Sequence, residues 1–281
     1  NVLIATSTGL SFNEFIINLG PPVLVMIGAL IVTTTVFYGK MMTVREEAKA
    51  RIMKARPELA IIDMPLLKRS MSVFALILVA FFVSHALHTE PGIIAIAGAL
   101  VMSIVCRSDL HHALEKVEWN SVFFFIGLFM LIGALEYNGV FKLLGDYILE
   151  VTAGNFMVAV ITILWFAAIV SAIVDNIPLV IAMLPLLKSI IPKFAEQMSI
   201  TDPALIRAQV EEPLFWALAL GACLGGNGTI VGASANVVVT QIARRNNYPL
   251  TFMAFTRIGL PVMLMTLTIS TGYLYLRYFA F

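Results

Sequence analysis

The sequence predicts an all-α membrane protein that crosses the bilayer several times. Three observations support this fold class: 60% of the 281 residues are hydrophobic, only 12% are charged, and the mean hydropathy is +0.94. A soluble domain has roughly 45–50% apolar and about 25% charged residues. A net charge of +1 gives no electrostatic attraction for a nucleic acid. We therefore expect the lipid bilayer as the main partner of the chain and no nucleic-acid partner.

The first 69 residues divide into an apolar part and a basic part. The run Leu19–Gly39 is long enough for one membrane helix, which needs about 20 apolar residues. Residues 40–69 hold twice as many basic as acidic residues, so the positive-inside rule puts them in the cytoplasm. We therefore expect residues 1–39 to end a first structural repeat, residues 40–69 to form a cytoplasmic linker, and residues 70–281 to form a second repeat.

Four elements are expected at the start of this second repeat. The apolar runs Ser70–Leu87, Pro91–Cys106 and Trp119–Tyr137 would cross the membrane outward, inward and outward. Gly139–Thr152 has apolar residues at helical spacing on one face and charged residues beside it. This pattern is typical of a helix that lies in the membrane interface.

A helical hairpin is expected over residues 156–192. Two apolar arms, Phe156–Val174 and Leu179–Ile191, flank the polar turn Asp175–Pro178. Because the second arm is short for a membrane span, we expect a re-entrant hairpin with its tip at mid-membrane. Residues Pro192–Glu212 are polar and are expected to be a connector.

A broken helix is expected over residues 213–244, followed by a last membrane helix over residues 257–281. The interruption is the stretch Gly225–Asn236, in which four of twelve residues are Gly. Each Gly inside a helix costs about 1 kcal/mol relative to Ala, so a continuous helix is disfavoured. Unwound backbone at membrane depth offers carbonyl groups, amide groups and helix ends to an ion.

Short matches between the two ends of the chain indicate an internal repeat. Leu10–Phe15 resembles Leu250–Phe255, and Leu19–Val23 resembles Ile258–Val262. In the expected topology the two copies face opposite ways, which is typical of transporters. The first copy begins at Asn1, which matches the last residue of the Gly-rich stretch. We therefore expect the chain to lack most of the first repeat.

Asp175 is the strongest candidate for a functional residue, because it is the only acid with long apolar arms on both sides. An acid at the bilayer centre costs about 2.5–3.5 kcal/mol on insertion scales. The alternative is a helix cap, but capping would be served equally well by an uncharged side chain. We favour an ion-binding or proton-carrying role. The neighbouring Asn176 supplies an amide oxygen suited to Na⁺ or to fixing an anion.

The Gly-rich stretch extends this candidate site. Helix packing explains its small residues but not its hydroxyl and amide side chains. Their oxygens suit a cation, and free N–H groups at the start of the second half-helix suit an anion. Gly232 is expected to need a positive φ. The expected Na⁺ ligands are Asp175, Asn176, Asn227 and Ser234. The whole expected ion site comprises Ser171, Asp175, Asn176, Pro178, Gly226, Asn227, Gly228, Thr229, Gly232, Ser234 and Asn236.

Catalytic chemistry is not indicated. The chain has no phosphate-binding Gly-Lys-Ser/Thr loop and no evident nucleophile with its base. We therefore expect no enzyme, no ATP hydrolysis by this chain, and no cofactor other than Na⁺ or H⁺ as a coupling ion.

The stretches Ser171–Pro178 and Leu224–Asn236 resemble the ion transporter superfamily. The similarity is strongest to the branch of ArsB/NhaD-type permeases and the pink-eyed dilution (P) protein, over most of residues 119–260, with citrate transporter-like domains as further relatives. The resemblance implies two inverted repeats, each with a re-entrant hairpin and a discontinuous helix, in a homodimer. It also implies that the Asp175–Asn176 tip and residues 227–236 line the substrate and ion site.

We therefore expect a secondary active transporter of a small inorganic anion or carboxylate, coupled to Na⁺ or H⁺. Two alternatives within transport are a Na⁺/H⁺ antiporter and an arsenite efflux permease with an ATPase subunit. An alternative of another class is a non-transporting membrane scaffold or an inactive half-transporter. The chain should be a multi-pass integral membrane protein, in the plasma membrane if the organism is prokaryotic.

Overall fold

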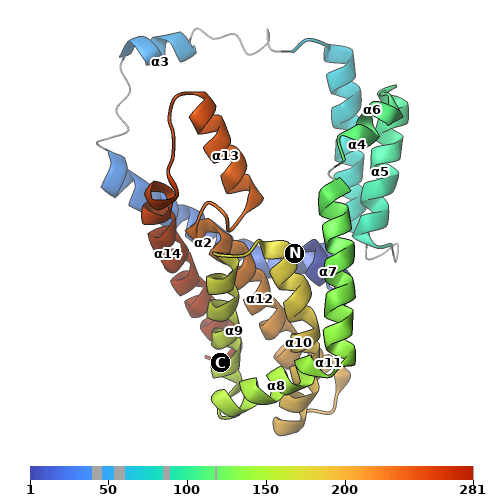
Figure 1. Ribbon diagram of the computed structural model, residues 1–281, viewed down its shortest axis with the longest axis vertical. Helices are drawn as coiled ribbons and strands as arrows, with labels where there is room; N and C mark the ends of the chain where they lie inside the picture. The colour runs from blue at the N-terminus through green and yellow to red at the C-terminus, as the bar shows by residue number, and fades with distance from the viewer. Residues whose placement is uncertain (40–45, 54–60, 85–88, 118, 281) are drawn as a thin grey trace.

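The computed structural model describes residues 1–39, 46–53, 61–84, 89–117 and 119–280 (Figure 1). This part of the chain is built from helices, turns and coil, with no strand. Four of its helices are long and apolar enough to cross a membrane, and a bent pair, α7 with α8, makes up to five. The prediction of an all-α polytopic membrane protein is confirmed.

The helices follow one another closely along the chain. In order they are α1 (Val2–Thr8), α2 (Phe12–Tyr38), α3 (Glu46–Met53), α4 (Met64–Val83), α5 (Pro91–Val105), α6 (Leu110–Glu115), α7 (Trp119–Tyr137), α8 (Val140–Val151), α9 (Phe156–Ser171), α10 (Asn176–Gln197), α11 (Pro203–Ile206), the π-helical turn Arg207–Glu211, α12 (Glu212–Gly225), the 3₁₀ turn Gly226–Gly228, α13 (Ser234–Arg245) and α14 (Phe252–Tyr278).

Three membrane helices begin earlier than the apolar runs suggest, because polar side chains cap them. Ser11 and Glu14 form a reciprocal capping box at the start of α2. Asp63 accepts a hydrogen bond from Leu66 N at 2.9 Å and starts α4, which takes the expected linker residues 64–69 into the helix. Thr251 caps α14 in the same way, so the last helix starts at Phe252 rather than Arg257.

The hairpin arms also differ from their expected lengths. α10 continues through Pro192 to Gln197, so it has 22 residues and is long enough to cross a membrane. Phe194 is fully buried and its ring lies 5.2 Å from the ring of Phe156 on α9. This packing stabilises the last turns of α10 despite the proline. The expected connector Pro192–Glu212 is therefore mostly helical, with a coil segment only between α10 and α11.

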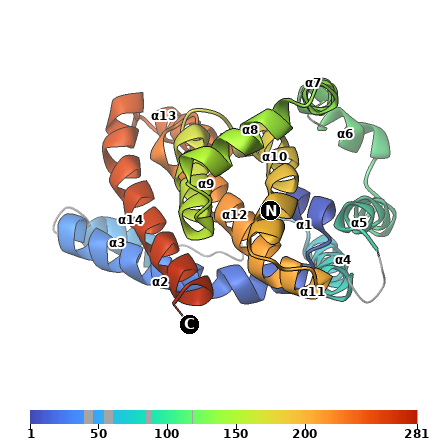
Figure 2. The same cartoon turned by 90° about the horizontal axis from the view of Figure 1, so that it is seen from below.

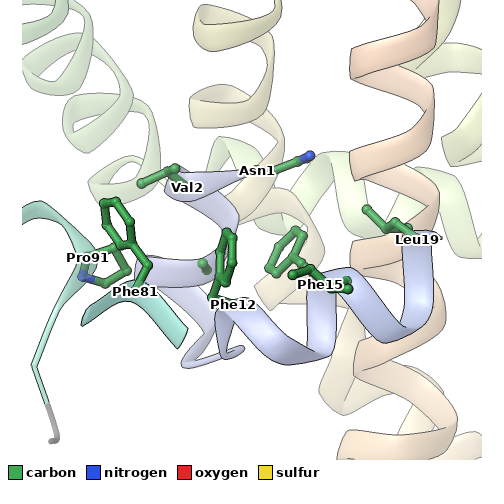
Figure 3. Close-up of a pocket in the computed structure, with 9 residues that line it drawn as sticks. Asn1, Val2, Phe12, Phe15, Leu19, Phe81 and Pro91 are labelled. Carbon is green, nitrogen blue, oxygen red and sulfur yellow. The ribbon is translucent and has the colours of Figure 1, made fainter. Parts of the chain in front are cut away.

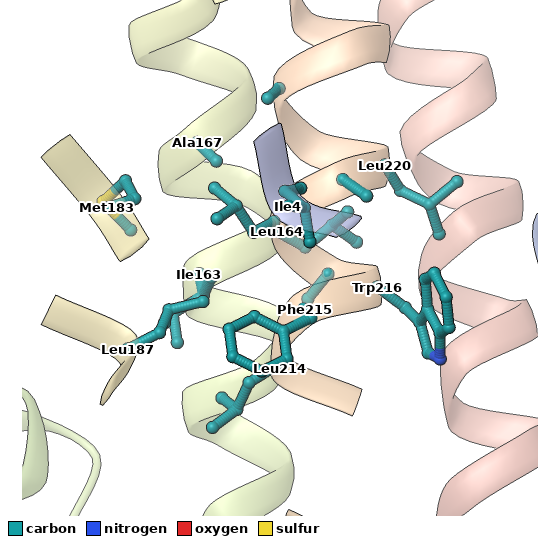
Figure 4. Close-up of a cluster of buried hydrophobic side chains, with 14 of the residues drawn as sticks. Ile4, Ile163, Leu164, Ala167, Met183, Leu187, Leu214, Phe215, Trp216 and Leu220 are labelled. Atoms are coloured by element: carbon teal, nitrogen blue, oxygen red, sulfur yellow. The ribbon is translucent and has the colours of Figure 1, made fainter. Parts of the chain in front are cut away.

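The core lies where α9, α10 and α12 meet, with α14 against α12 (Figures 1 and 4). α9 and α12 approach closely because Gly221 and Gly225 face the backbone of α9. A Cβ atom at Gly221 would lie 2.4 Å from the carbonyl oxygen of Leu164, and one at Gly225 would lie 2.3 Å from that of Ala168. Two glycines four residues apart are the usual means of bringing membrane helices together.

The helices α2 and α14 run antiparallel, as inverted repeats require. Each has 27 residues and begins after a hydroxyl cap. At one end Tyr273 Oη donates to Asn18 O at 2.5 Å. At the other end Tyr38 and Pro261 line a shared cavity of about 610 Å³. The residues matched in the sequence therefore lie on two equal helices of opposite direction.

The two ends of the molecule are formed by different helices. Figure 1 shows α3, α6 and α13 at the upper end and α8 and α11 at the lower end. The upper end carries the pair Arg244–Arg245 at the end of α13, and the lower end carries residues of both charges, among them Asp146 and Lys193. The cytoplasmic location expected for residues 40–69 stays a prediction.

Candidate functional site

The turn between α9 and α10 holds the first half of the candidate site. α9 ends at Ser171 and α10 begins at Asn176. The Asp175 carboxylate caps α10, since its Oδ1 accepts a hydrogen bond from Ile177 N at 3.2 Å. Pro178 lies in the first turn of α10. Backbone N–H groups of a first turn have no partner inside the helix, so proline loses no helical hydrogen bond there. Asp175 is partly exposed, so its carboxylate remains accessible beside the cap.

Asn176 ties this turn to α12 and to the interrupted segment. We orient its amide with the nitrogen towards the surrounding oxygens, because the opposite orientation would face oxygen with oxygen. Nδ2 then lies 2.7 Å from Ser171 Oγ, 3.1 Å from Ala222 O and 3.0 Å from Gly232 O. Ser171, which is fully buried, donates its own hydroxyl to Ala222 O at 2.6 Å.

The helix that contains the Gly-rich stretch is interrupted. After α12 the chain makes the 3₁₀ turn Gly226–Gly228, runs through residues 229–233, and resumes as α13 at Ser234. Thr229 holds this segment against the end of α9, because its hydroxyl donates to Ala172 O and accepts from Gly232 N at 3.1 Å.

Asn236 closes the interruption from the other side. Its Nδ2 donates to Gly226 O at 2.9 Å and to Thr229 O at 3.0 Å. A Cβ atom at Gly232 would lie 2.8 Å from both Gly226 O and Ser171 O. No glycine of residues 225–236 has a positive φ, so that expectation is wrong. Gly232 is required because backbone segments approach it closely.

Asn236→Ala is expected to lower the free energy of unfolding by about 1–3 kcal/mol, because two carbonyl oxygens lose their shared donor. Thermal unfolding of the purified protein in detergent measures this change. Asn246→Ala is the matched control, since Asn246 is exposed and donates one bond to Ile242 O at 2.9 Å. Equal midpoints for the two variants would show that the Asn236 amide does not support the interruption.

The remaining expected residues lie at the edges of this junction. Gly228 packs on Met263 of α14, where a Cβ atom would lie 2.6 Å from Sδ. The Asn227 backbone approaches Gly259 of α14, while its side chain is exposed. Ser234 is exposed in the first turn of α13. Neither the Asn227 nor the Ser234 side chain has a hydrogen bond to any residue that the structure describes.

The expected residues thus divide into two groups. One group uses its polar atoms to join the hairpin turn to the interruption: Ser171, Asn176 through its nitrogen, Gly226, Thr229, Gly232 and Asn236. The other group has side-chain oxygens that make no hydrogen bond with the described residues, apart from the one capping bond of Asp175: Asp175, Asn227 and Ser234. These three residues and Asn176 are the expected Na⁺ ligands, and that assignment stays a prediction.

The helix ends at this junction provide both signs of partial charge. The hydrogen bond between Asn176 and Gly232 O brings together the starts of α10 and α13. Helix starts carry a partial positive charge and favour anions. The ends of α9 and α12 carry carbonyl groups and a partial negative charge. Segments 171–178 and 225–236 contain one ionisable side chain, that of Asp175.

The backbone carbonyls of Ala172 and Ala222 belong to the junction and were not expected from the sequence. Each accepts a hydrogen bond from a residue more than 50 positions away. The one sequence signal for this contact is the pair Gly221 and Gly225, whose spacing indicates close packing of α12 on another helix.

Apolar cavities lie elsewhere in the molecule. Figure 3 shows one of about 290 Å³, where Phe12 and Phe15 of α2 meet Phe81 of α4. The described residues contain no group of three His, Cys, Asp or Glu side chains that could hold a metal ion. The polar junction is therefore a surface of backbone and amide groups rather than a carboxylate-rich metal centre.

The chain is similar to known membrane proteins over most of its length. It is 37% identical over 279 residues to an uncharacterized transporter of Mycobacterium tuberculosis, and 36% identical over 278 residues to a 46 kDa membrane protein of Mycobacterium leprae. These alignments cover 99% of this chain and 62% of each relative, so the chain spans about three fifths of their length.

A mammalian protein also matches. The P protein of the mouse is 38% identical over 227 residues, which are 75% of this chain and 25% of the mouse protein. No solved structure matches significantly. The predicted resemblance is confirmed, and the chain is an integral membrane protein related to transporters.

The model of one protein family matches a large part of the chain. The profile described as citrate transporter matches residues 1–210, from α1 to the π-helical turn before α12. It ends before the interruption, which the mycobacterial alignments include because they cover 99% of the chain. The chain belongs to the citrate transporter family.

Proposed function

We propose that the protein is a secondary active transporter that couples the movement of a small inorganic anion or carboxylate to Na⁺ or H⁺. The observation that supports this most is the hydrogen-bonded junction between the α9–α10 turn and the interruption after α12. Interrupted helices that meet at one place in a membrane protein give a small ion both backbone dipoles and a water-accessible path. Membership of a transporter family supports the same function.

The two groups of residues at the junction suggest how coupling works. Asp175 would repel an anion from the starts of α10 and α13 while its carboxylate is unpaired. A bound Na⁺ or proton removes that repulsion, and the two helix starts then attract an anion. Cation binding and anion binding thus favour each other at one site. The ligands for Na⁺ would be Asp175, Asn176, Asn227 and Ser234.

Na⁺/H⁺ antiport is the second candidate, and one feature favours it. Asp175 is the single ionisable side chain of the junction and is partly exposed. One carboxylate that binds either Na⁺ or H⁺, but not both, is sufficient for exchange. The same site would then need no separate anion.

The proposal extends to assembly and location. We propose a homodimer, in the plasma membrane if the organism is prokaryotic. Arsenite efflux with an ATPase subunit would need a partner chain, so transport by the purified protein alone would separate it from the gradient-driven mechanism.

Transport by purified protein in liposomes tests the proposal. Labelled citrate, succinate, sulfate and arsenite are offered with an inward Na⁺ gradient, a pH gradient or neither. Accumulation of one ion above its equilibrium level only with a gradient is expected. A pH-sensitive dye inside the liposomes reports Na⁺/H⁺ exchange. Accumulation of none of these ions and no exchange would contradict the proposal.

A further inference from the structure

A deep apolar groove lies on the hairpin, on a surface that the ion junction does not use. α9 packs on α12, and α8 crosses beside the lower parts of the hairpin arms (Figures 1 and 2). Between α8, α9 and α10 lies a groove of about 440 Å³. Its wall includes Tyr147 and Ile148 of α8, Phe166 and Val170 of α9, and Ala182 and Met183 of α10.

We propose that this groove binds one acyl chain of a membrane phospholipid. The groove continues onto exposed apolar surface, since Phe166 is 51% exposed and the neighbouring Ile169 is 55% exposed. In an integral membrane protein, lipid is the apolar medium available to such a surface. Water is a poor occupant, because it needs two to four polar partners and the groove surface is apolar.

The length of the groove fits one leaflet. Its wall on α9 extends from Thr162 to Val170, which is roughly 12 Å at 1.5 Å per residue. One leaflet contributes about half of the roughly 30 Å hydrocarbon core. α8 forms one wall of the groove. Its apolar and charged residues lie on separate sides, as in a helix at the membrane surface.

The charged groups near α8 fit a zwitterionic headgroup. Lys193 of α10 forms an ion pair of 2.6 Å with Asp146 of α8 and approaches Lys142 O at 3.4 Å. Lys142 and Glu150 lie one turn before and after Asp146 on α8. Both signs of charge are therefore present on α8 directly beside residues of the groove wall, since Asp146 precedes Tyr147 and Glu150 precedes Val151. The adaptable side chain of Met183 suits a flexible hydrocarbon chain.

Photo-crosslinking in nanodiscs tests this site. The nanodiscs contain phosphatidylethanolamine with a photoactivatable group on one acyl chain, and mass spectrometry locates the adducts. Adducts are expected on the groove faces of α9 and α10. Ala182→Trp fills the groove and should lower them by about tenfold or more, the factor expected when about two methylene groups lose their contacts.

Two further variants make the result decisive. Val151→Trp enlarges an exposed residue of the groove wall on α8, where Val151 is 60% exposed, so it obstructs the groove without disturbing the core. Ala75→Trp is the matched control, because Ala75 is exposed on α4. Lower labelling in Ala182→Trp and Val151→Trp with unchanged labelling in Ala75→Trp supports the proposal. Three outcomes overturn it: no groove adducts in the wild type, adducts that persist in Val151→Trp, or cross-links between two protein copies at the groove in place of lipid.

Discussion

Gly225→Ala is expected to lower the free energy of unfolding by about 3 kcal/mol or more, although Ala favours a helix by about 1 kcal/mol over Gly. The new Cβ atom would lie 2.3 Å from Ala168 O and 2.5 Å from Ala168 Cα. Both atoms belong to the backbone, so they cannot turn aside as a flexible side chain would. α9 and α12 must separate, and the packing of the core between them is lost.

The thermal midpoint and the monodisperse yield in detergent measure this effect. Gly272→Ala on α14 is the control, because a Cβ atom there would meet nothing within 4 Å. It is expected to be neutral or to stabilise the protein by up to about 1 kcal/mol, as helix propensity predicts. A Gly225→Ala protein as stable as Gly272→Ala would show that α9 and α12 do not pack as closely as described.

Where a boundary signal coincides with an apolar run, the helices could be predicted well. α7 has the expected bounds, and α5 and α9 begin at the expected residues. Pro91 starts α5 and Asn155 caps α9, and each is followed at once by apolar residues. Chain composition, local caps and apolar length all indicate the same element in these cases.

The starts of α2 and α14 were missed although local signals were present. Ser11 with Glu14 is a capping box, and Thr251 is a cap three residues before Ala254. Hydropathy alone places the start of a helix where the apolar run begins, so the polar first turns were excluded. The end of α10 is a different case. Pro192 indicates a boundary, and only the burial of Phe194 against another helix overrides it.

The position of the interruption could be predicted, but the hydrogen bonds that stabilise it could not. The glycines of residues 225–232 weaken a helix locally, whatever surrounds it. The bonds from Thr229 to Ala172 O and from Asn176 to Gly232 O join segments that lie more than 50 residues apart in the chain. No pattern in a single sequence contains such pairings. The two bonds from the Asn236 nitrogen to backbone carbonyls were not expected either, while its role as an oxygen ligand stays a prediction.

Asp175→Asn is expected to abolish coupling while leaving the protein folded. Asn caps helices as well as Asp does, so the bond to Ile177 N is retained. The charge that would hold Na⁺ or H⁺ is removed. Loss of one charged contact of about 2–3 kcal/mol would raise the half-saturating Na⁺ concentration roughly 30- to 150-fold. Uptake in liposomes over a range of Na⁺ concentrations and pH values measures the change.

Asp202→Asn is the control that separates the loss of the Asp175 charge from a change in helix capping. Asp202 caps α11 through a bond of 2.9 Å from Ala204 N, and α11 lies in the lower part of the molecule, away from the junction. Its variant should keep the wild-type Na⁺ and pH dependence, because only an exposed cap is altered. If Asp175→Asn also kept both dependences, the carboxylate would serve only as the cap of α10. Coupling would then have to depend on the neutral oxygens of Asn176, Asn227 and Ser234, whose affinity for Na⁺ would not change with pH.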